Sequence, residues 1–355
     1  MLVKLNHIIV YSLVAVVLAW VIYPLYIKIL KKLKVWKTIR EDTATGEKSV
    51  IFAKLHKHKS GTPTMWWGVF LIVMLIMIWV SFILEKYDLI NNTLFNQKET
   101  YIILFGFFSM GIIGLIDDFL NVKWYGTIKW LSAKTKLIGM CLFSAFISRW
   151  FYSKLWIDYI NFWPIAGEVS LGIFYPIITF FVTISIVNAI NITDWLDWLA
   201  GWLMSIVLFV FAVLTFLNQT YIATTVLAIL IAVLIAFMFF NINPAKIFMW
   251  DSGAFALGWF LSSLLYLLNM RMGIFVPFVI LFGLFILEVG SSGLQIFWKK
   301  RFKKKLFPMS PLHHLFEYRW ISETTIVMKA RLIQWLLAAI TLIAIFYQIN
   351  IVILN

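Results

Sequence analysis

The densest cluster of polar side chains lies between two long apolar runs, in the segment N-A-I-N-I-T-D-W-L-D-W-L-A at residues 188–200. Asp194 and Asp197 are three residues apart, so both would lie on one face if this segment is helical. Two carboxylates on one face can hold a cation together or orient a ligand that carries phosphate. A hydrated turn between two membrane spans is the alternative. Charged groups close to lipid are costly, however, so this combination of amides, hydroxyl and carboxylates indicates a functional site.

A second pair of carboxylates, Asp117 and Asp118, closes an apolar run in the sequence G-L-I-D-D-F. Neighbouring positions on a helix point about 100° apart, so one carboxylate would face a site while the other caps the helix, binds a basic group or reaches a second ligand. Plain solvation at the membrane surface is the alternative. Asp251 lies directly before another apolar run, where it could act in a site or simply favour the dipole of a helix start.

Further groups that could meet phosphate follow along the chain. Two adjacent imidazoles, His313 and His314, can donate to phosphate, bind a metal or shuttle protons, or they can be incidental. On a helix, Glu288, Ser291 and Gln295 would form one polar stripe that must face protein or water. Four lysines follow Asp117 and Asp118, and each alone is also typical of an anchor on the inner face of a membrane: Lys123, Lys129, Lys134 and Lys136.

The composition shows which elements must position these groups. Of the 355 residues 63% are hydrophobic and only 13% are charged, which identifies an integral membrane protein. The apolar runs are about 17–25 residues long, as in membrane-spanning helices and unlike the short alternating strands of a barrel. In such a protein the net charge of +14 reports orientation and attraction to anionic lipid, so nucleic acid is not expected as a partner. The single Cys141 excludes an internal disulfide.

We predict one all-α membrane domain over residues 1–355 with about ten transmembrane helices. Basic residues are concentrated after the first and the ninth span, which places both loops in the cytoplasm and both termini outside. Alternation of the spans then brings the carboxylates, the amides and the histidines to the cytoplasmic ends of the helices. The predicted spans are 6–30, 66–84, 101–119, 135–152, 171–189, 200–217, 221–240, 254–269, 274–297 and 331–354.

Taken in order, these segments resemble the phospho-N-acetylmuramoyl-pentapeptide-transferase family, within the polyprenyl-phosphate N-acetylhexosamine-1-phosphate transferase superfamily, over nearly the whole chain. Several ordered motifs at the right spacing are far more specific than any one of them. The matching segments are L-K-V-W-K-T-I-R-E at 33–41, G-T-P-T-M at 61–65, D-D at 117–118, L-S-A-K-T-K-L at 131–137, the segment at 188–200, F-M-W-D-S-G at 248–253, E-V-G-S-S-G-L-Q at 288–295 and P-L-H-H-L-F-E at 311–317.

The resemblance implies a multi-pass protein of the bacterial inner membrane, usually a homodimer, whose cleft faces the cytoplasm. The family transfers phospho-N-acetylmuramoyl-pentapeptide from UDP-MurNAc-pentapeptide to undecaprenyl phosphate, releases UMP and needs Mg²⁺. Such phosphoryl transfer needs charge neutralisation and in-line positioning more than covalent chemistry, which agrees with clustered carboxylates and lysines. The lipid phosphate is already mostly ionised near neutral pH, so we expect it to attack directly, with Asp117 in a positioning role.

Position within the matching motifs implies a role for each candidate residue. Asp251 would bind Mg²⁺, with Asp117 and Asp118 beside it. The family commonly has three consecutive histidines, whereas Leu315 stands at the third position here, so that role is absent or moved. The residues implied to be catalytic are Asp117, Asp118, Asp251, His313 and His314, and those implied to contact the nucleotide, the phosphates or the sugar are Lys136, Asn188, Asn191, Asp194 and Asp197.

A departure from the family is tryptophan at ten motif positions where glycine is usual. Glycine is used where φ is positive or where backbones approach closely, and a large ring cannot replace it there without displacing its surroundings. Overpacking costs about 1–3 kcal/mol per site, so ten uncompensated changes would exceed a folding margin of about 5–15 kcal/mol. We predict that the source cell reads UGA as glycine at these positions; rings that stack on the uracil or the lipid are the alternative. The positions are Trp36, Trp66, Trp67, Trp130, Trp195, Trp198, Trp202, Trp250, Trp259 and Trp320.

Two other functions fit part of the pattern. A related transferase that uses UDP-GlcNAc-like donors would share the aspartate motifs, but the segments at 61–65 and 311–317 favour the muramoyl branch. A transporter or lipid flippase would place charges near the membrane midplane and interrupt helices in corresponding halves. In this sequence the charges gather at one membrane face, which favours the enzyme.

Overall fold

Helices account for nearly all of the regular structure in the computed structural model, which describes residues 2–36, 59, 61–87, 94, 98–122 and 133–354. Within these ranges the strands are one short antiparallel pair, β1 (Tyr159–Asn161) and β2 (Glu168–Ser170). The helices are α1 (Leu2–Lys32), α3 (Trp67–Lys86), α4 (Lys98–Val122), α5 (Ala133–Lys154), the 3₁₀ turn η2 (Gly172–Phe174), α6 (Tyr175–Thr193), α7 (Leu199–Leu217), α8 (Tyr221–Asn241), α9 (Trp250–Met272), α10 (Phe275–Leu281), α11 (Gly283–Phe302), α12 (Leu312–Tyr318) and α13 (Glu323–Leu354).

Seven of these helices are long and apolar enough to cross a membrane, and α10 with α11 makes an eighth span if the bent pair counts as one. The chain is therefore a multi-pass membrane protein. α4 and α5 are also long, with 25 and 22 residues, and coincide with two further predicted spans. Nine of the ten predicted ranges fall mainly on one helix each and the ninth, 274–297, covers α10 and α11, while the number of spans stays a prediction.

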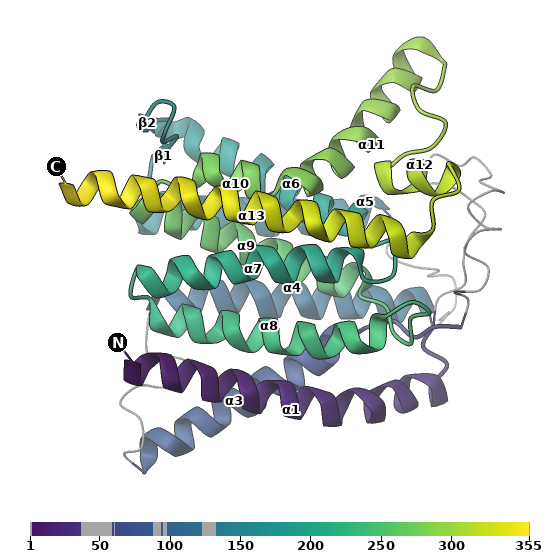
Figure 1. The fold of residues 1–355 in the computed structure, drawn as a ribbon, viewed down its shortest axis with the longest axis horizontal. Coiled ribbons are helices and arrows are strands. Elements are labelled where there is room, and N and C mark those ends of the chain that lie inside the picture. The colour runs from purple at the N-terminus through teal and green to yellow at the C-terminus, as the bar shows by residue number, and fades with distance from the viewer. Residues whose placement is uncertain are drawn as a thin grey trace.

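The bundle is organised around α9, which packs against α4 and α6 (Figure 1). Its side chains from Ser252 to Asn269 are buried, as expected for a helix that is apolar on all sides. By contrast, α1 and α13 expose large apolar side chains such as Val17 and Ile343, which would face lipid in a membrane. Asp251 is the second residue of α9, so the most completely buried helix carries one of the predicted site residues.

The ninth predicted span, 274–297, is a bent pair of helices, α10 and α11, rather than one continuous helix, and its assignment as a single span stays a prediction. α10 and α11 meet at Phe282 with a bend of 74°. At this point the buried amide of Gln334 on α13 donates to the carbonyl of Leu281 at 2.8 Å. A side chain that inserts into the backbone ladder is a common cause of a kink. As a result, α11 leaves the bundle and extends away from it above α12 (Figure 1).

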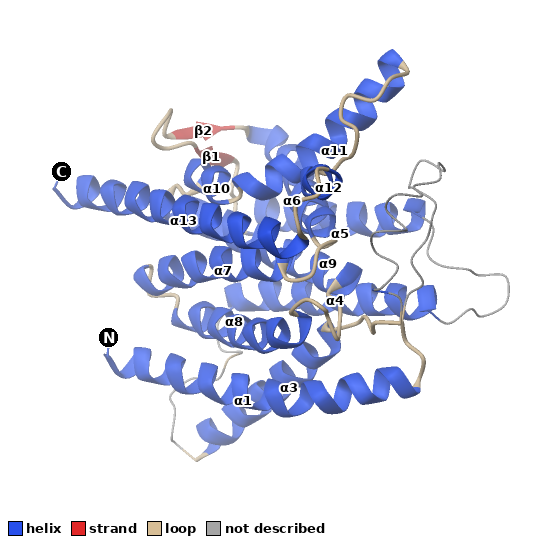
Figure 2. Cartoon of the chain, turned by 45° about the vertical axis from the view of Figure 1, so that its right-hand side comes forward, coloured by secondary structure: helices blue, strands red, loops and turns tan. Residues whose placement is uncertain are grey.

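The start of α1 and the end of α13 lie at the same end of the bundle, whereas α12 lies at the opposite end (Figures 1 and 2). A chain that crosses a membrane an even number of times begins and ends on the same side of it. The arrangement agrees with two termini on one side of a membrane, although the identity of that side stays a prediction.

Candidate active site

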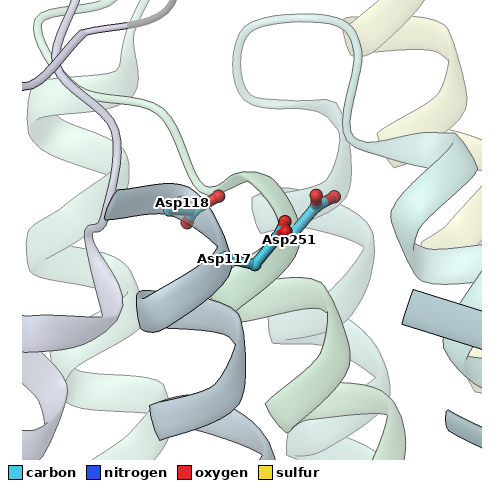
Figure 3. Close-up of side chains that lie close together, drawn as sticks. All are labelled: Asp117, Asp118 and Asp251. Carbon is cyan, nitrogen blue, oxygen red and sulfur yellow. The ribbon is translucent and has the colours of Figure 1, made fainter. Parts of the chain in front are cut away.

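Three carboxylates from two helices converge at one end of the bundle. Asp117 and Asp118 lie in the last turns of α4, and Asp251 lies in the first turn of α9. One oxygen from each of the three lies within 4.8 Å of the others, and Asp117 and Asp118 are almost fully buried. Figure 3 shows Asp117 pointing toward Asp251, while Asp118 points toward the backbone at the start of α9.

Close packing of α4 against α9 brings these residues together. Gly114 lies one turn before Asp118, and a side-chain carbon at Gly114 would overlap the backbone of Ser252. The missing side chain therefore permits the two helices to approach next to the carboxylates. The backbone N–H of Ser252 donates to Asp118 at 3.3 Å, which uses one of the free donors at a helix start.

A lysine and an asparagine complete this cluster. The Lys136 ammonium pairs with Asp117 at 2.6 Å and also with Asp251. The amide of Asn191 donates to the other oxygen of Asp251 at 2.7 Å. Like charges this close repel one another unless a cation or donors compensate, so Lys136 and Asn191 stabilise the ionised pair. The structure thus brings together five of the predicted site residues: Asp117, Asp118, Lys136, Asn191 and Asp251.

The donor set fits a divalent cation. Carboxylate oxygens are the ligands that Mg²⁺ prefers, and proteins usually bind it through one or two carboxylates, leaving its remaining positions to substrate phosphates and water. Asp117 and Asp251 can provide these two ligands, since their oxygens already converge on one ammonium. Asp118 lies within the same group but is also used by the backbone of Ser252.

Asp194 and Asp197 do not share a helix face, and that expectation is wrong. α6 ends at Thr193 and α7 begins at Leu199, and Trp198 between them has the left-handed φ of 76°. The backbone N–H of Trp198 donates to the Asn241 side chain at 2.8 Å, which stabilises the break. The two carboxylates therefore belong to a turn and serve different neighbours.

Asp194 joins the acidic cluster through the backbone. Its carboxylate accepts a hydrogen bond from the N–H of Trp250 at 2.7 Å, directly before Asp251. Burial, with further repulsion from Asp251 and Asp118, raises the pKa of Asp194 well above its usual range. Asn188 lies on α6, where its amide donates to the Ile184 carbonyl at 2.8 Å, and none of its described contacts reaches the acidic cluster.

Asp197 belongs to a second buried network. It pairs with Lys59 at 2.8 Å and accepts hydrogen bonds from the Asn243 amide at 3.1 Å and the Ala245 N–H at 3.2 Å. Glu323, at the start of α13, pairs with the same lysine at 2.6 Å. Glu323 was not among the residues that the sequence predicted for the site. Its only signal was an acidic residue at the beginning of a long apolar run, which is common at helix starts.

The histidine pair lies on the short helix α12, and both rings are buried. His313 Nδ1 lies 3.0 Å from a Glu288 carboxylate oxygen on α11, and His314 Nδ1 lies 2.6 Å from Glu317. The His313 Nε2 atom has no hydrogen-bond partner among the described residues. Trp195 in the turn after α6 lies against His314, with ring centroids 6.1 Å apart.

The predicted polar stripe on α11 faces protein. Glu288 holds His313, and Gln295 accepts hydrogen bonds from the N–H groups of Leu306 and Phe307 at 3.1 and 2.9 Å. The stripe therefore fixes the segment that leads to α12. Some predicted features lie outside the described residues: Lys123, Lys129, Trp130, residues 37–41 of the first matching segment and residues 131–132 of the fourth.

Comparison with known proteins matches this chain to one kind of transferase. A family model described as glycosyl transferase family 4 matches residues 100–269, from α4 to α9, and this range contains all three clustered aspartates. A phospho-N-acetylmuramoyl-pentapeptide-transferase of Dictyoglomus turgidum is 35% identical over 332 residues, 93% of this chain and 95% of the relative. Proteins of the same name from Thermoanaerobacter sp. and Clostridium acetobutylicum are 33% and 30% identical, over 98% and 90% of this chain and 100% and 93% of the relatives.

Proposed function

Because the chain belongs to the phospho-N-acetylmuramoyl-pentapeptide-transferase family, we propose that it transfers phospho-N-acetylmuramoyl-pentapeptide from UDP-MurNAc-pentapeptide to undecaprenyl phosphate. The products are lipid I, a precursor of peptidoglycan, and UMP. The observation that carries this proposal is the convergence of Asp117, Asp118 and Asp251 with Lys136 at one end of a membrane helix bundle. A cluster in this position can receive a water-soluble nucleotide and a lipid phosphate together.

In this reaction an oxygen of the lipid phosphate attacks the donor phosphorus next to the sugar. A new P–O bond forms, the diphosphate bond breaks, and UMP leaves with the bonding electrons. Mg²⁺ held by Asp251 and Asp117, with Asp118 beside them, would supply neutralisation of the diphosphate charge. Asn191 keeps Asp251 oriented through its amide. Lys136 offers a positive charge to an anionic phosphate at the same place.

The other assignments belong to the same proposal. Asp194 would set the start of α9 against the diphosphate site through its bond to the Trp250 N–H. His313 and His314 would meet the phosphates or the sugar from α12. Asn188 and Asp197 complete the set proposed to support nucleotide binding, with Asp197 acting from the buried network around Lys59.

The membrane arrangement is also proposed. We place ten spans in the bacterial cytoplasmic membrane, with both termini outside, the acidic cluster at the cytoplasmic face and the protein as a homodimer. The basic residues in the last turn of α11 and directly after it support this orientation, since positive charge favours the cytoplasmic side: Lys299, Lys300, Arg301, Lys303, Lys304 and Lys305. The positions of the chain ends at one end of the bundle agree with an even number of spans.

The proposal is tested with purified protein in detergent, undecaprenyl phosphate and radiolabelled UDP-MurNAc-pentapeptide or UDP-GlcNAc. We expect labelled lipid and UMP from the muramoyl donor only, and loss of both products when EDTA removes Mg²⁺. Transfer from UDP-GlcNAc alone would instead support the related N-acetylhexosamine branch. Lipid movement across vesicles without any UMP release would support a flippase.

A further inference from the structure

Glu323 lies where three separate connections meet. Its Oε1 atom lies 2.6 Å from the Lys59 ammonium and accepts a hydrogen bond from the Asp197 backbone N–H at 2.5 Å. Its Oε2 atom accepts from the Asn243 amide at 3.3 Å. These partners lie ahead of α3, between α6 and α7, and between α8 and α9. One side chain at the start of α13 thus joins segments that are far apart in the sequence.

The charges of this network explain why it is held together. Burial lowers the pKa of Lys59, but the carboxylates of Asp197 and Glu323 more than offset this and raise it, so the lysine stays protonated. Breaking one partner of a buried ionic group leaves an uncompensated charge, whereas the intact group adds little net stability. Such a network is therefore better suited to fixing a geometry than to stabilising the fold.

Two backbone connections link this network to the acidic cluster. Asp197 is three residues after Asp194, which binds the Trp250 N–H next to Asp251. Asp197 also accepts from the Ala245 N–H, in the connection that leads to α9. A shift of Glu323 would therefore move both connections that deliver residues to the cluster.

We propose that Glu323 is a positioning residue for the transferase reaction. It holds the turn between α6 and α7 through the Asp197 N–H and keeps Lys59 paired with Asp197. In this way it sets the position of Asp194 against the start of α9. This inference rests on the proposed function and assigns a role to a side chain that does not itself touch the acidic cluster in any described contact.

The test compares Glu323→Gln and Glu323→Asp with Glu168→Gln, a matched change on the exposed strand β2. The glutamine removes the charge at constant size, and the aspartate keeps the charge but shortens the reach. We expect Glu323→Gln to lower kcat by about 10- to 100-fold, because misplacement of a catalytic constellation has effects of this size. Glu323→Asp should recover part of this loss, whereas Glu168→Gln should behave like the unmodified enzyme.

Hydrogen exchange supplies a readout that does not depend on activity. We expect Glu323→Gln to speed exchange in residues 194–198 and 243–251, with no change in the folded fraction or in exchange within α7 and α8. Unchanged exchange in the two connections, wild-type kcat, or a loss of turnover that only follows the loss of folded protein would each overturn the inference. Absence of transfer by the unmodified enzyme would instead overturn the proposed function, and the exchange result would still decide the role of Glu323.

Discussion

Lys136 and Asp251 are 115 residues apart in the sequence, yet they form an ion pair where α5 meets the start of α9. The same ammonium pairs with Asp117, so a single lysine compensates two carboxylates from different helices. A divalent cation that binds these carboxylates must compete with that ammonium. Substitutions of Asp251 and of Lys136 therefore test how a cation and the ammonium share these carboxylates.

Asp251→Asn should nearly abolish transfer and leave the folded protein intact, because it removes a hard anionic ligand without changing the volume. Turnover is measured over a range of Mg²⁺ concentrations, with Asp158→Asn near β1 as the matched control. Near-normal turnover of Asp251→Asn at every Mg²⁺ concentration would show that the assignment of the metal ligand is wrong.

Lys136→Met should strengthen the response to Mg²⁺ while it weakens turnover. Without the ammonium, Asp117 and Asp251 repel each other and bind a divalent cation more tightly. The measurement is the rise in thermal unfolding temperature on addition of Mg²⁺, which we expect to be larger in Lys136→Met than in the unmodified enzyme. Lys154→Met, at the other end of α5, is the control. An equal rise in all three proteins would exclude the competition.

His313→Ala should lower turnover by about 100-fold, in the range typical of a positioned acid or base, and should affect assembly less. Glu288 holds the Nδ1 atom, and Nε2 has no hydrogen-bond partner among the described residues, so Nε2 is the atom proposed to meet a phosphate or sugar. The exposed His7 on α1 provides the control His7→Ala. If folded yield and turnover fall by the same factor, His313 serves the structure alone.

The sequence was sufficient for the long apolar helices and for the carboxylates at their ends, because both depend on strong local signals. The position of Asp251 beside Asp117 and Asp118 was implied by the family resemblance and not by these signals. Long apolar runs can only be satisfied as helices in lipid, and carboxylates at their ends are rare enough to stand out. The break between helices at residues 194–198 and the bend at Phe282 could not be predicted from such local signals. Each depends on a side chain from a distant helix, Asn241 in one case and Gln334 in the other. Glu323 was missed for the same reason, since its partners are brought together only by the fold.

The tryptophans at expected glycine positions show two kinds of misfit in the structure. Three of them have a left-handed backbone, with φ of 76° at Trp198, 54° at Trp250 and 63° at Trp320. For a residue other than glycine this conformation costs about 1–2 kcal/mol. Trp156, which was not among the ten predicted positions, has a φ of 57° and joins this group.

The second misfit concerns buried rings. The indole N–H groups of Trp66, Trp67, Trp202 and Trp259 are buried without a hydrogen-bond partner among the described residues. An unsatisfied buried donor costs about 1–3 kcal/mol. Some compensation is present, because three of these rings lie directly over glycines of a neighbouring helix: Trp66 over Gly253, Trp67 over Gly111 and Trp259 over Gly106. Packing space is therefore found for these rings, but their polar atoms are not satisfied.

Trp320→Gly should stabilise the protein, and it is the clearest test of the prediction that glycine belongs at these positions. The Trp320 side chain is 89% exposed, so its removal loses little packing and isolates the backbone effect. The relief of about 1–2 kcal/mol of backbone strain exceeds the entropy cost of about 0.4–1 kcal/mol for a more flexible unfolded chain. Trp79→Gly is the control: this ring is 65% exposed within α3, where glycine should destabilise by about 0.5–1 kcal/mol. Thermal unfolding in detergent measures both changes.

The gene provides an independent test. UGA codons at Trp198, Trp250 and Trp320 support glycine in the source cell. UGG codons there, or a less stable Trp320→Gly protein, would show that tryptophan is the native residue.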